Sequence, residues 1–137
     1  MSLKVLIVED DALTAAAFAA ALADAGHRVV GIADSAQGAV SRAAESHADL
    51  ALIDITLRDG RTGLATARAL HDDYRVKTVL VSGDGNLGAK ADAVHALGYI
   101  AKPADANVVA RAVTTLERHQ RGGVQPTATR VSAQVLE

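Results

Sequence analysis

The chain has 137 residues, half of them hydrophobic, and a formal net charge of −2 at neutral pH, which suits one domain with a sizeable core. The absence of cysteine excludes disulfides, thiol catalysis and cysteine-bound metals. The scattered basic residues argue against a nucleic-acid binder, and no apolar run approaches the roughly 20 residues that span a bilayer. With no signal segment at its start, we expect a cytoplasmic protein without nucleic-acid or membrane partners.

Short apolar runs rich in β-branched residues alternate with longer, alanine-rich segments. The runs are apolar on both faces, which is typical of strands buried in a parallel sheet. We therefore predict five strands, at Leu3–Val8, Arg28–Ala33, Leu50–Ile53, Thr78–Val81 and Tyr99–Ala101.

The segments between these runs carry apolar residues at helical spacing. They predict five helices, at about 13–25, 35–46, 63–72, 87–97 and 105–121. Asp11 and Ser35 are the expected N-caps of the first two helices, Asp34 is also interpreted as a cap, and Gly26 ends the first helix. Such alternation predicts an α/β fold whose parallel sheet has helices on both faces.

The character of the sequence changes after the fifth helix. Gly122-Gly123 breaks the helical pattern, and residues 124–137 are mixed in polarity and without clear period. We expect one domain at residues 1–121 and a flexible tail or linker remnant at 122–137. A strand that docks on a partner is the alternative for this last segment.

Polar side chains lie at the ends of four of the predicted strands. Glu9 and Asp10 follow the first strand, Asp54 ends the third, Ser82-Gly83 ends the fourth, and Lys102 follows the fifth. Taken singly, each has an ordinary interpretation as a helix cap, a turn or a solvated charge. Because these four strands are neighbours in the parallel fold, their carboxyl ends converge, and we expect one pocket there.

Three carboxylates in one pocket repel one another, and their pKa values rise unless a cation neutralises them. A cluster of oxygen ligands without histidine or cysteine suits a hard cation, above all Mg²⁺. Lys102 adds a positive charge and Ser82 a hydroxyl donor. An acceptor carboxylate, a metal, a cation and a donor together predict a site for phosphoryl transfer.

These residues lie in segments that resemble the signature blocks of bacterial response-regulator receiver domains: Val8–Asp11, Asp54–Leu57, Val81–Gly83 and Tyr99–Pro103. The resemblance covers about residues 3–119. It implies a doubly wound (βα)5 fold of the flavodoxin and CheY type, with five parallel strands in the order 2-1-3-4-5. It also implies a two-component or phosphorelay signalling protein that catalyses only its own phosphorylation and dephosphorylation and is not otherwise an enzyme.

The resemblance also implies an acceptor and a metal site. Asp54 would accept the phosphoryl group from a phosphohistidine on a sensor histidine kinase or a histidine phosphotransfer protein. Asp10 would bind Mg²⁺ directly and Glu9 would hold it through water. Asp54 and the backbone carbonyl of Thr56 would complete the ligand set.

The remaining matches concern the response to phosphorylation. Lys102 would pair with one phosphoryl oxygen, and Ser82 would move to donate a hydrogen bond to another. Tyr99 matches the aromatic residue that turns inward when Ser82 moves. The bond between Lys102 and Pro103 is expected to be cis.

Two regions depart from the family pattern. Arg58 stands where the family usually has proline, and a glycine-punctuated loop follows at 59–63. The stretch at 85–99 is about two residues shorter than usual, which predicts a short or tilted fourth helix. Because that face often carries output and dimerisation in the family, the surface for a downstream partner or a homodimer stays open. Asp84 is expected to affect the phosphoryl lifetime by ordering or repelling an attacking water.

Other functions were weighed against this one. A receiver-like interaction module that signals without phosphorylation is the main alternative, and the complete set of acids, serine and lysine argues against it. Phosphatases with an aspartate nucleophile usually carry a second aspartate two residues later, where this chain has Thr56. A dinucleotide-binding fold is disfavoured because no glycine-rich turn follows the first strand.

Overall fold

The computed structural model describes residues 3–55, 62–83, 85–122 and 129–130. Strands and helices alternate in the order β1 (Lys4–Val8), α1 (Ala12–Asp24), β2 (Arg28–Ala33), α2 (Ala36–Ser46), β3 (Leu50–Asp54), α3 (Thr62–Tyr74), β4 (Lys77–Ser82), α4 (Leu87–Ala93), β5 (Gly98–Ala101), α5 (Ala106–Gly122) and β6 (Thr129–Arg130). All five predicted strands and helices are present, and their boundaries differ by one or two residues except at the end of α4. No helix in the described part of the chain is long and apolar enough to cross a membrane.

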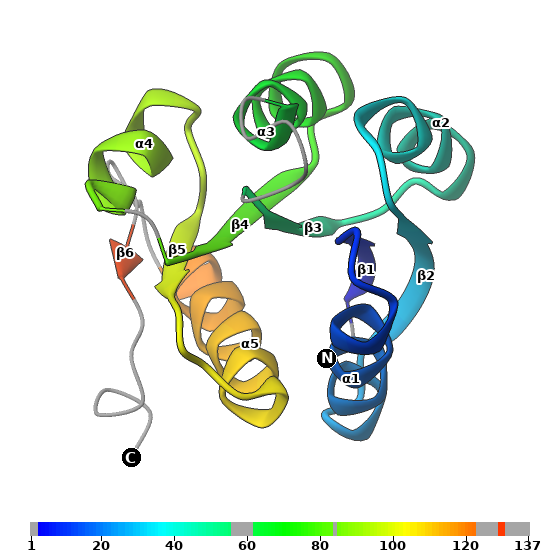
Figure 1. Ribbon diagram of the computed structural model, residues 1–137, viewed down its shortest axis with the longest axis vertical. Coiled ribbons are helices and arrows are strands. Elements are labelled where there is room, and N and C mark those ends of the chain that lie inside the picture. The colour runs from blue at the N-terminus through cyan, green and yellow to red at the C-terminus, as the bar shows by residue number, and fades with distance from the viewer. Residues whose placement is uncertain (1–2, 56–61, 84, 123–128, 131–137) are drawn as a thin grey trace.

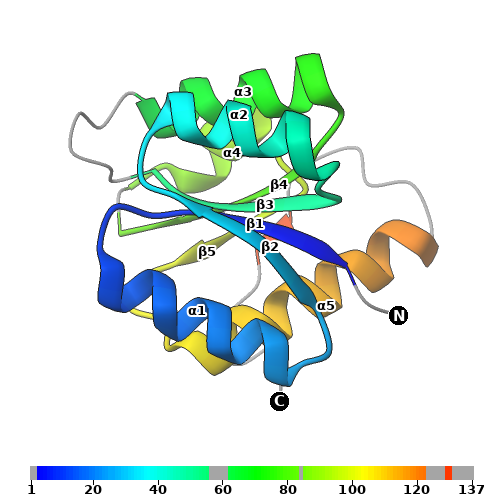
Figure 2. The same cartoon turned by 90° about the vertical axis from the view of Figure 1, so that its right-hand side faces the viewer.

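All strands are parallel, in the order β2-β1-β3-β4-β5-β6 (Figure 1). Helices α1 and α5 cover one face of the sheet, and α2, α3 and α4 cover the other (Figure 2). The predicted fold class and the order 2-1-3-4-5 are confirmed. The sixth strand was not predicted, since residues 129–130 were assigned to a flexible tail.

The core follows from the alternation of side chains along the strands, because successive residues point to opposite faces. Val5 and Ile7 of β1 pack under α1 and α5, whereas Leu6 and Val8 pack under α2 and α3. The strands β1, β3 and β4 are buried on both faces, as predicted. Strand β2 is not, and Ile32 is 40% exposed because β2 lies at the edge of the sheet.

The helix starts largely follow the predicted capping. Asp11 caps α1, where its carboxylate accepts from the amide of Thr14 at 3.0 Å. Ser35 caps α2 and accepts from the amide of Gly38 at 3.1 Å. The interpretation of Asp34 as a cap is wrong, because Ser35 has the extended backbone that aims an N-cap oxygen into the first turn.

Helix α4 ends at Ala93, four residues before the predicted end at Leu97. The amide of Leu97 donates to the carbonyl of Thr78 in β4 at 2.8 Å, so this residue already belongs to the sheet. His95 adopts a positive φ of 58°, which turns the chain out of the helix. The expectation of a short fourth helix is therefore confirmed, and the competing bond to β4 is its physical cause.

His27 joins the start of β1 to α5 through partly buried hydrogen bonds. Its Nδ1 accepts from the amide of Leu3 at 3.2 Å, so the neutral ring carries its proton on Nε2. Nε2 donates to the hydroxyl of Thr114 at 2.8 Å, and Thr114 donates to the carbonyl of Ala110 at 3.2 Å. Protonation of Nδ1 would place its N–H group against the backbone N–H of Leu3 and so remove this hydrogen bond.

We expect the free energy of unfolding to fall as the pH drops below about 6.5, the ordinary pKa of histidine. Burial lowers the pKa of folded His27, although the charge of Glu117 opposes the shift. The unfolded chain then binds a proton that the folded chain does not, so the stability present above pH 6.5 is lost below it. Urea unfolding at pH 7.5 and 5.5 checks this, and an equal loss in wild type and His27→Gln would contradict it.

Candidate functional site

The carboxyl ends of four strands bring together most of the predicted site residues. Asp54 is the last residue of β3 and Ser82 the last of β4, while Glu9 and Lys102 directly follow β1 and β5. The parallel register aligns these ends along one edge of the sheet. Glu9, Asp54 and Ser82 are buried, and Asp10 is half-buried beside them in the chain. The strand ends therefore form an acidic site with one lysine.

Asp54 and Lys102 form an ion pair at the centre of this site. The Lys102 Nζ donates to Oδ2 of Asp54 at 2.8 Å. The Asp54 side chain is 4% exposed and that of Lys102 is 35% exposed. Since a buried carboxylate needs a partner charge and hydrogen bonds, Lys102 supplies the positive charge beside Asp54 and fixes the direction of its carboxylate.

Glu9 contacts Asp54 from the neighbouring strand end. Burial, followed by the hydrogen bond with Asp54 and the charge of that residue, raises the pKa of Glu9 to about 8. The charge of Asp10 acts in the same direction and that of Lys102 against it. Oε2 of Glu9 is buried without a hydrogen-bond partner. At neutral pH Glu9 is therefore mostly protonated unless a cation binds beside it.

The acidic side chains of the site suit a hard cation, but they do not form a complete ligand set for one. Within the described ranges, no three Asp, Glu, His or Cys side chains are arranged as a metal-ligand group. The unpartnered Oε2 of Glu9 lies in a site built from oxygen donors, the kind that Mg²⁺ prefers. Mg²⁺ also keeps several waters, so it needs only one or two protein carboxylates.

Ser82 and Tyr99 lie on the same face of the sheet. Ser82 is buried, and its carbonyl accepts from the amide of Lys102 at 3.0 Å, which ties the ends of β4 and β5 together. Tyr99 is half-buried against α4, where its ring lies over Gly88. A methyl group at Gly88 would stand 2.9 Å from the Tyr99 hydroxyl oxygen and 3.2 Å from Cζ. Gly88 therefore provides the space that Tyr99 occupies.

We expect Gly88→Ala to move the Tyr99 ring, because 2.9 Å is shorter than any ordinary contact to a methyl carbon. The ring resonances of Tyr99 should shift in NMR spectra, while those of Tyr74, the other tyrosine, stay in place. Unchanged Tyr99 resonances in the folded variant would refute the assignment of this space to Gly88.

The sequence placed Gly63 where the loop at 59–63 meets the predicted third helix, and the structure gives this glycine a packing role. It is buried in the first turn of α3, where an added Cβ would lie 2.6 Å from the Ile55 Cα and 3.2 Å from the Asp54 carbonyl oxygen. The helix thus crosses directly over the end of β3. In the sequence, this contact was indicated only by the position of Gly63 shortly after the acceptor strand.

Several predicted features lie outside the described residues. These are the backbone carbonyl of Thr56, Arg58 with most of the loop at 59–63, and Asp84. The bond between Lys102 and Pro103 is cis, as predicted.

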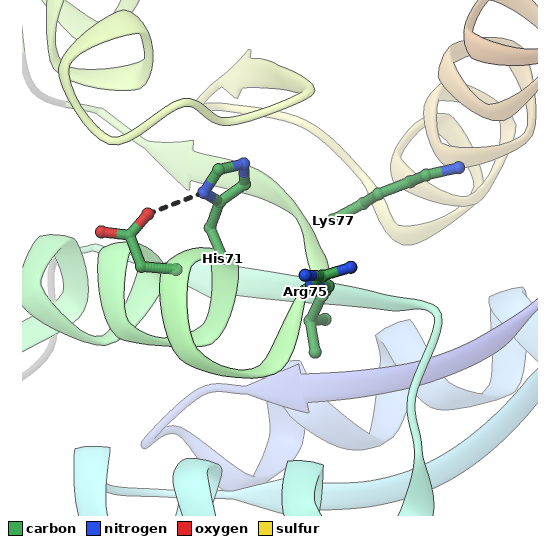
Figure 3. A pocket seen from close by; sticks show the side chains of 5 residues that line it. His71, Arg75 and Lys77 are labelled. Carbon is green, nitrogen blue, oxygen red and sulfur yellow. Dashed lines mark hydrogen bonds and ion pairs between the residues drawn. The ribbon is translucent and has the colours of Figure 1, made fainter.

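An open pocket lies at the opposite end of the sheet, lined by His71, Asp72, Arg75, Val76 and Lys77. Lys77 begins β4, whereas Ser82 ends it. His71 contacts Asp72 at 2.9 Å, but the labelled side chains of His71, Arg75 and Lys77 point in different directions (Figure 3). The pocket therefore lacks the converging groups found at the carboxyl ends of the strands.

Comparison with known proteins gives consistent matches. A sequence model of the response regulator receiver domain matches residues 5–114. The chain is 34% identical over 128 residues to the two-component response regulator PhoP of Pseudomonas aeruginosa, covering 91% of this chain and 56% of that protein. It is 35% identical over 115 residues to the acid tolerance regulatory protein ActR of Rhizobium meliloti, covering 80% of this chain and 57% of that protein.

Solved structures agree with this match. The signal receiver domain of a modulated diguanylate cyclase from Desulfovibrio desulfuricans superposes with a TM-score of 0.75 at 29% identity, covering 90% of this chain and all of that one. The chain spans little more than half the length of the two curated relatives.

Proposed function

Because the chain belongs to the response regulator receiver domain family and so to two-component signalling, we propose that Asp54 accepts a phosphoryl group from a phosphohistidine in a Mg²⁺-dependent reaction. The observation that carries the proposal is the buried Asp54 carboxylate, held by Lys102 at 2.8 Å beside the buried Glu9. An ionised carboxylate fixed at the carboxyl edge of a parallel sheet is a poised nucleophile.

In the proposed reaction, one carboxylate oxygen of Asp54 attacks phosphorus in line with the phosphorus–nitrogen bond of the donor. That bond breaks, the electron pair stays on the imidazole nitrogen, and an acyl phosphate forms on Asp54. Lys102, which is hydrogen-bonded to Asp54, would move to a negatively charged phosphoryl oxygen. Its side chain is partly exposed and so has room for this movement. Bound Mg²⁺ would neutralise charge on the transferred group.

The proposed metal site uses the acids around Asp54. Asp10 and Asp54 would bind Mg²⁺ directly, with Glu9 acting through water and the carbonyl of Thr56 completing the set. Support comes from the partner-free Oε2 of Glu9 and from the crowding of carboxylates, which a divalent cation relieves.

The response to phosphorylation is proposed to run from Ser82 to Tyr99. The Ser82 hydroxyl would donate to a phosphoryl oxygen, and Tyr99, on the same sheet face, would take up the space that Ser82 leaves. The change would alter a surface for a downstream protein. The upstream partner would be a sensor histidine kinase or a histidine phosphotransfer protein, met in the cytoplasm. The chain would catalyse only its own phosphorylation and dephosphorylation.

Incubation with acetyl phosphate tests the proposal without a kinase, since this donor needs only the receiver's own catalysis. We expect intact-mass spectrometry to show one added phosphoryl group with Mg²⁺ and a much smaller fraction with a chelator present. A folded wild-type chain that gains no mass with Mg²⁺ would instead favour an interaction module that works without phosphorylation.

A further inference from the structure

The outer edge of β5 is covered by a strand from beyond α5. Gly98 pairs with Thr129 and Tyr99 pairs with Arg130, both in parallel register. Figure 1 shows β6 next to β5, at the end of the sheet away from β2. Without these two residues β5 would be an edge strand with unpaired backbone groups, which readily pair with another extended chain.

The β5–α5–β6 connection differs in hand from the other crossovers of the described fold. In the β1–α1–β2 unit the chain moves towards the β2 edge of the sheet, and the helix lies on the face covered by α1 and α5. In the β3–α3–β4 and β4–α4–β5 units the chain moves towards the β6 edge, and the helix lies on the opposite face. Because both the direction and the face are reversed, the three units have the same hand. The unit ending in β6 steps in the direction of β3–α3–β4, but α5 lies on the face of α1, so its hand is reversed.

Parallel crossovers are right-handed in about 98% of cases, because only that hand lets a twisted strand and its helix pack back onto the sheet. The reversed crossover is therefore unfavourable for packing onto the sheet. Strand β6 is joined to the sheet by two residue pairs with β5. A strand with so short a pairing, reached by such a crossover, should leave the sheet more readily than the other strands.

We propose that the outer edge of β5 is a docking site for an extended strand, which the chain fills reversibly with its own Thr129–Arg130. The six residues between α5 and β6 keep that strand close, at an effective concentration on the order of millimolar. The segment thus competes with any partner that would add a strand there. This inference does not rest on phosphorylation of Asp54.

Hydrogen exchange of single amides tests the pairing in the full chain. The amide of Lys102 donates to the Ser82 carbonyl in β4, and amides alternate in direction along a strand, so the amide of Ile100 also points to β4 and that of Tyr99 points towards β6. We expect the double variant Thr129→Pro with Arg130→Pro to exchange the Tyr99 amide roughly three- to tenfold faster, as the loss of about one hydrogen bond implies.

The Ile100 amide points to β4 and serves as the internal control, and Gln134→Pro is the matched control variant in the same segment. Both should keep wild-type exchange. Unchanged exchange of Tyr99 in the double variant would overturn the proposal. So would protection of this amide that rises with protein concentration in the wild type, because the strand would then come from a second copy.

A synthetic peptide of residues 123–137 tests the competition. It should bind the double variant, slow the exchange of the Tyr99 amide again, and bind the wild type at least about tenfold more weakly because the tethered segment occupies the edge. Equal binding to both chains, or binding to neither, would contradict a site that the chain fills with its own strand.

Discussion

Asp54→Asn is expected to abolish the added phosphoryl group, because the amide oxygen is a poor nucleophile and cannot form an acyl phosphate. Asp34→Asn is the matched control, since Asp34 is an exposed aspartate just after the edge strand β2. This variant should gain the same mass as the wild type under acetyl phosphate and Mg²⁺. An undiminished gain in Asp54→Asn would place the acceptor elsewhere.

The same substitution has an expected effect on the neighbouring acid. The hydrogen bond with Asp54 and the charge of Asp54 are two of the causes that raise the pKa of Glu9. With asparagine at position 54, the pKa of Glu9 should fall below its wild-type value of about 8, although burial still holds it above that of an exposed glutamate. Carboxyl-carbon NMR titration of Glu9 measures the shift, and cooperative urea unfolding confirms that the variant is folded.

Gly63→Ala is expected to lower the free energy of unfolding by about 1–3 kcal/mol, the range for an overpacked site. The added Cβ would lie 2.6 Å from the Ile55 Cα and 3.2 Å from the Asp54 carbonyl oxygen. Both are backbone atoms, which cannot rotate away as a side chain can. The gain of about 1 kcal/mol from alanine in a helix does not offset this contact.

The matched control is Gly85→Ala, because a Cβ at Gly85 meets no atom within 4 Å. Urea unfolding should leave its midpoint close to that of the wild type. Gly63→Ala should also slow phosphorylation, since α3 would push on the end of β3 that carries Asp54. A Gly63→Ala chain with wild-type unfolding and wild-type phosphorylation would show that α3 and the end of β3 leave space for a methyl group at position 63.

The fold was predictable because its main determinants are local in the sequence. The strands β1, β3 and β4 are apolar on both faces, and the alanine-rich segments between them have helical period. The order of the strands followed from the alternation and the resemblance. Ser35 could be identified as a cap, whereas Asp34 misled, because two adjacent residues both have a capping side chain.

Features that depend on tertiary contact were not predictable. A short or tilted fourth helix was expected, but its end at Ala93 was not, because the Leu97 amide bonds to Thr78 in β4 and the apolar sequence there is equally suited to a helix. The strand β6 has no apolar pattern in its sequence, and its backbone pairing with the edge of β5 depends on the fold.

The residues of the site were predictable, but the main cause of the raised pKa of Glu9 and the close approach of Gly63 were not. The convergence of Glu9, Asp54, Ser82 and Lys102 follows from the ends of neighbouring strands. Repulsion among acids was the expected cause of a raised pKa, yet burial is the larger cause for Glu9. The close approach of Gly63 to the backbone at Ile55 depends on where α3 crosses β3.

The most direct measurement is to find which residue carries the phosphoryl group after reaction with acetyl phosphate and Mg²⁺. Borohydride reduces an acyl phosphate to an alcohol, so a phosphorylated aspartate is converted to homoserine, which peptide sequencing by mass spectrometry locates. We predict homoserine at position 54 and nowhere else in the chain. Homoserine at Asp10 or Asp34, with Asp54 unmodified, would contradict the assignment of Asp54 as the acceptor.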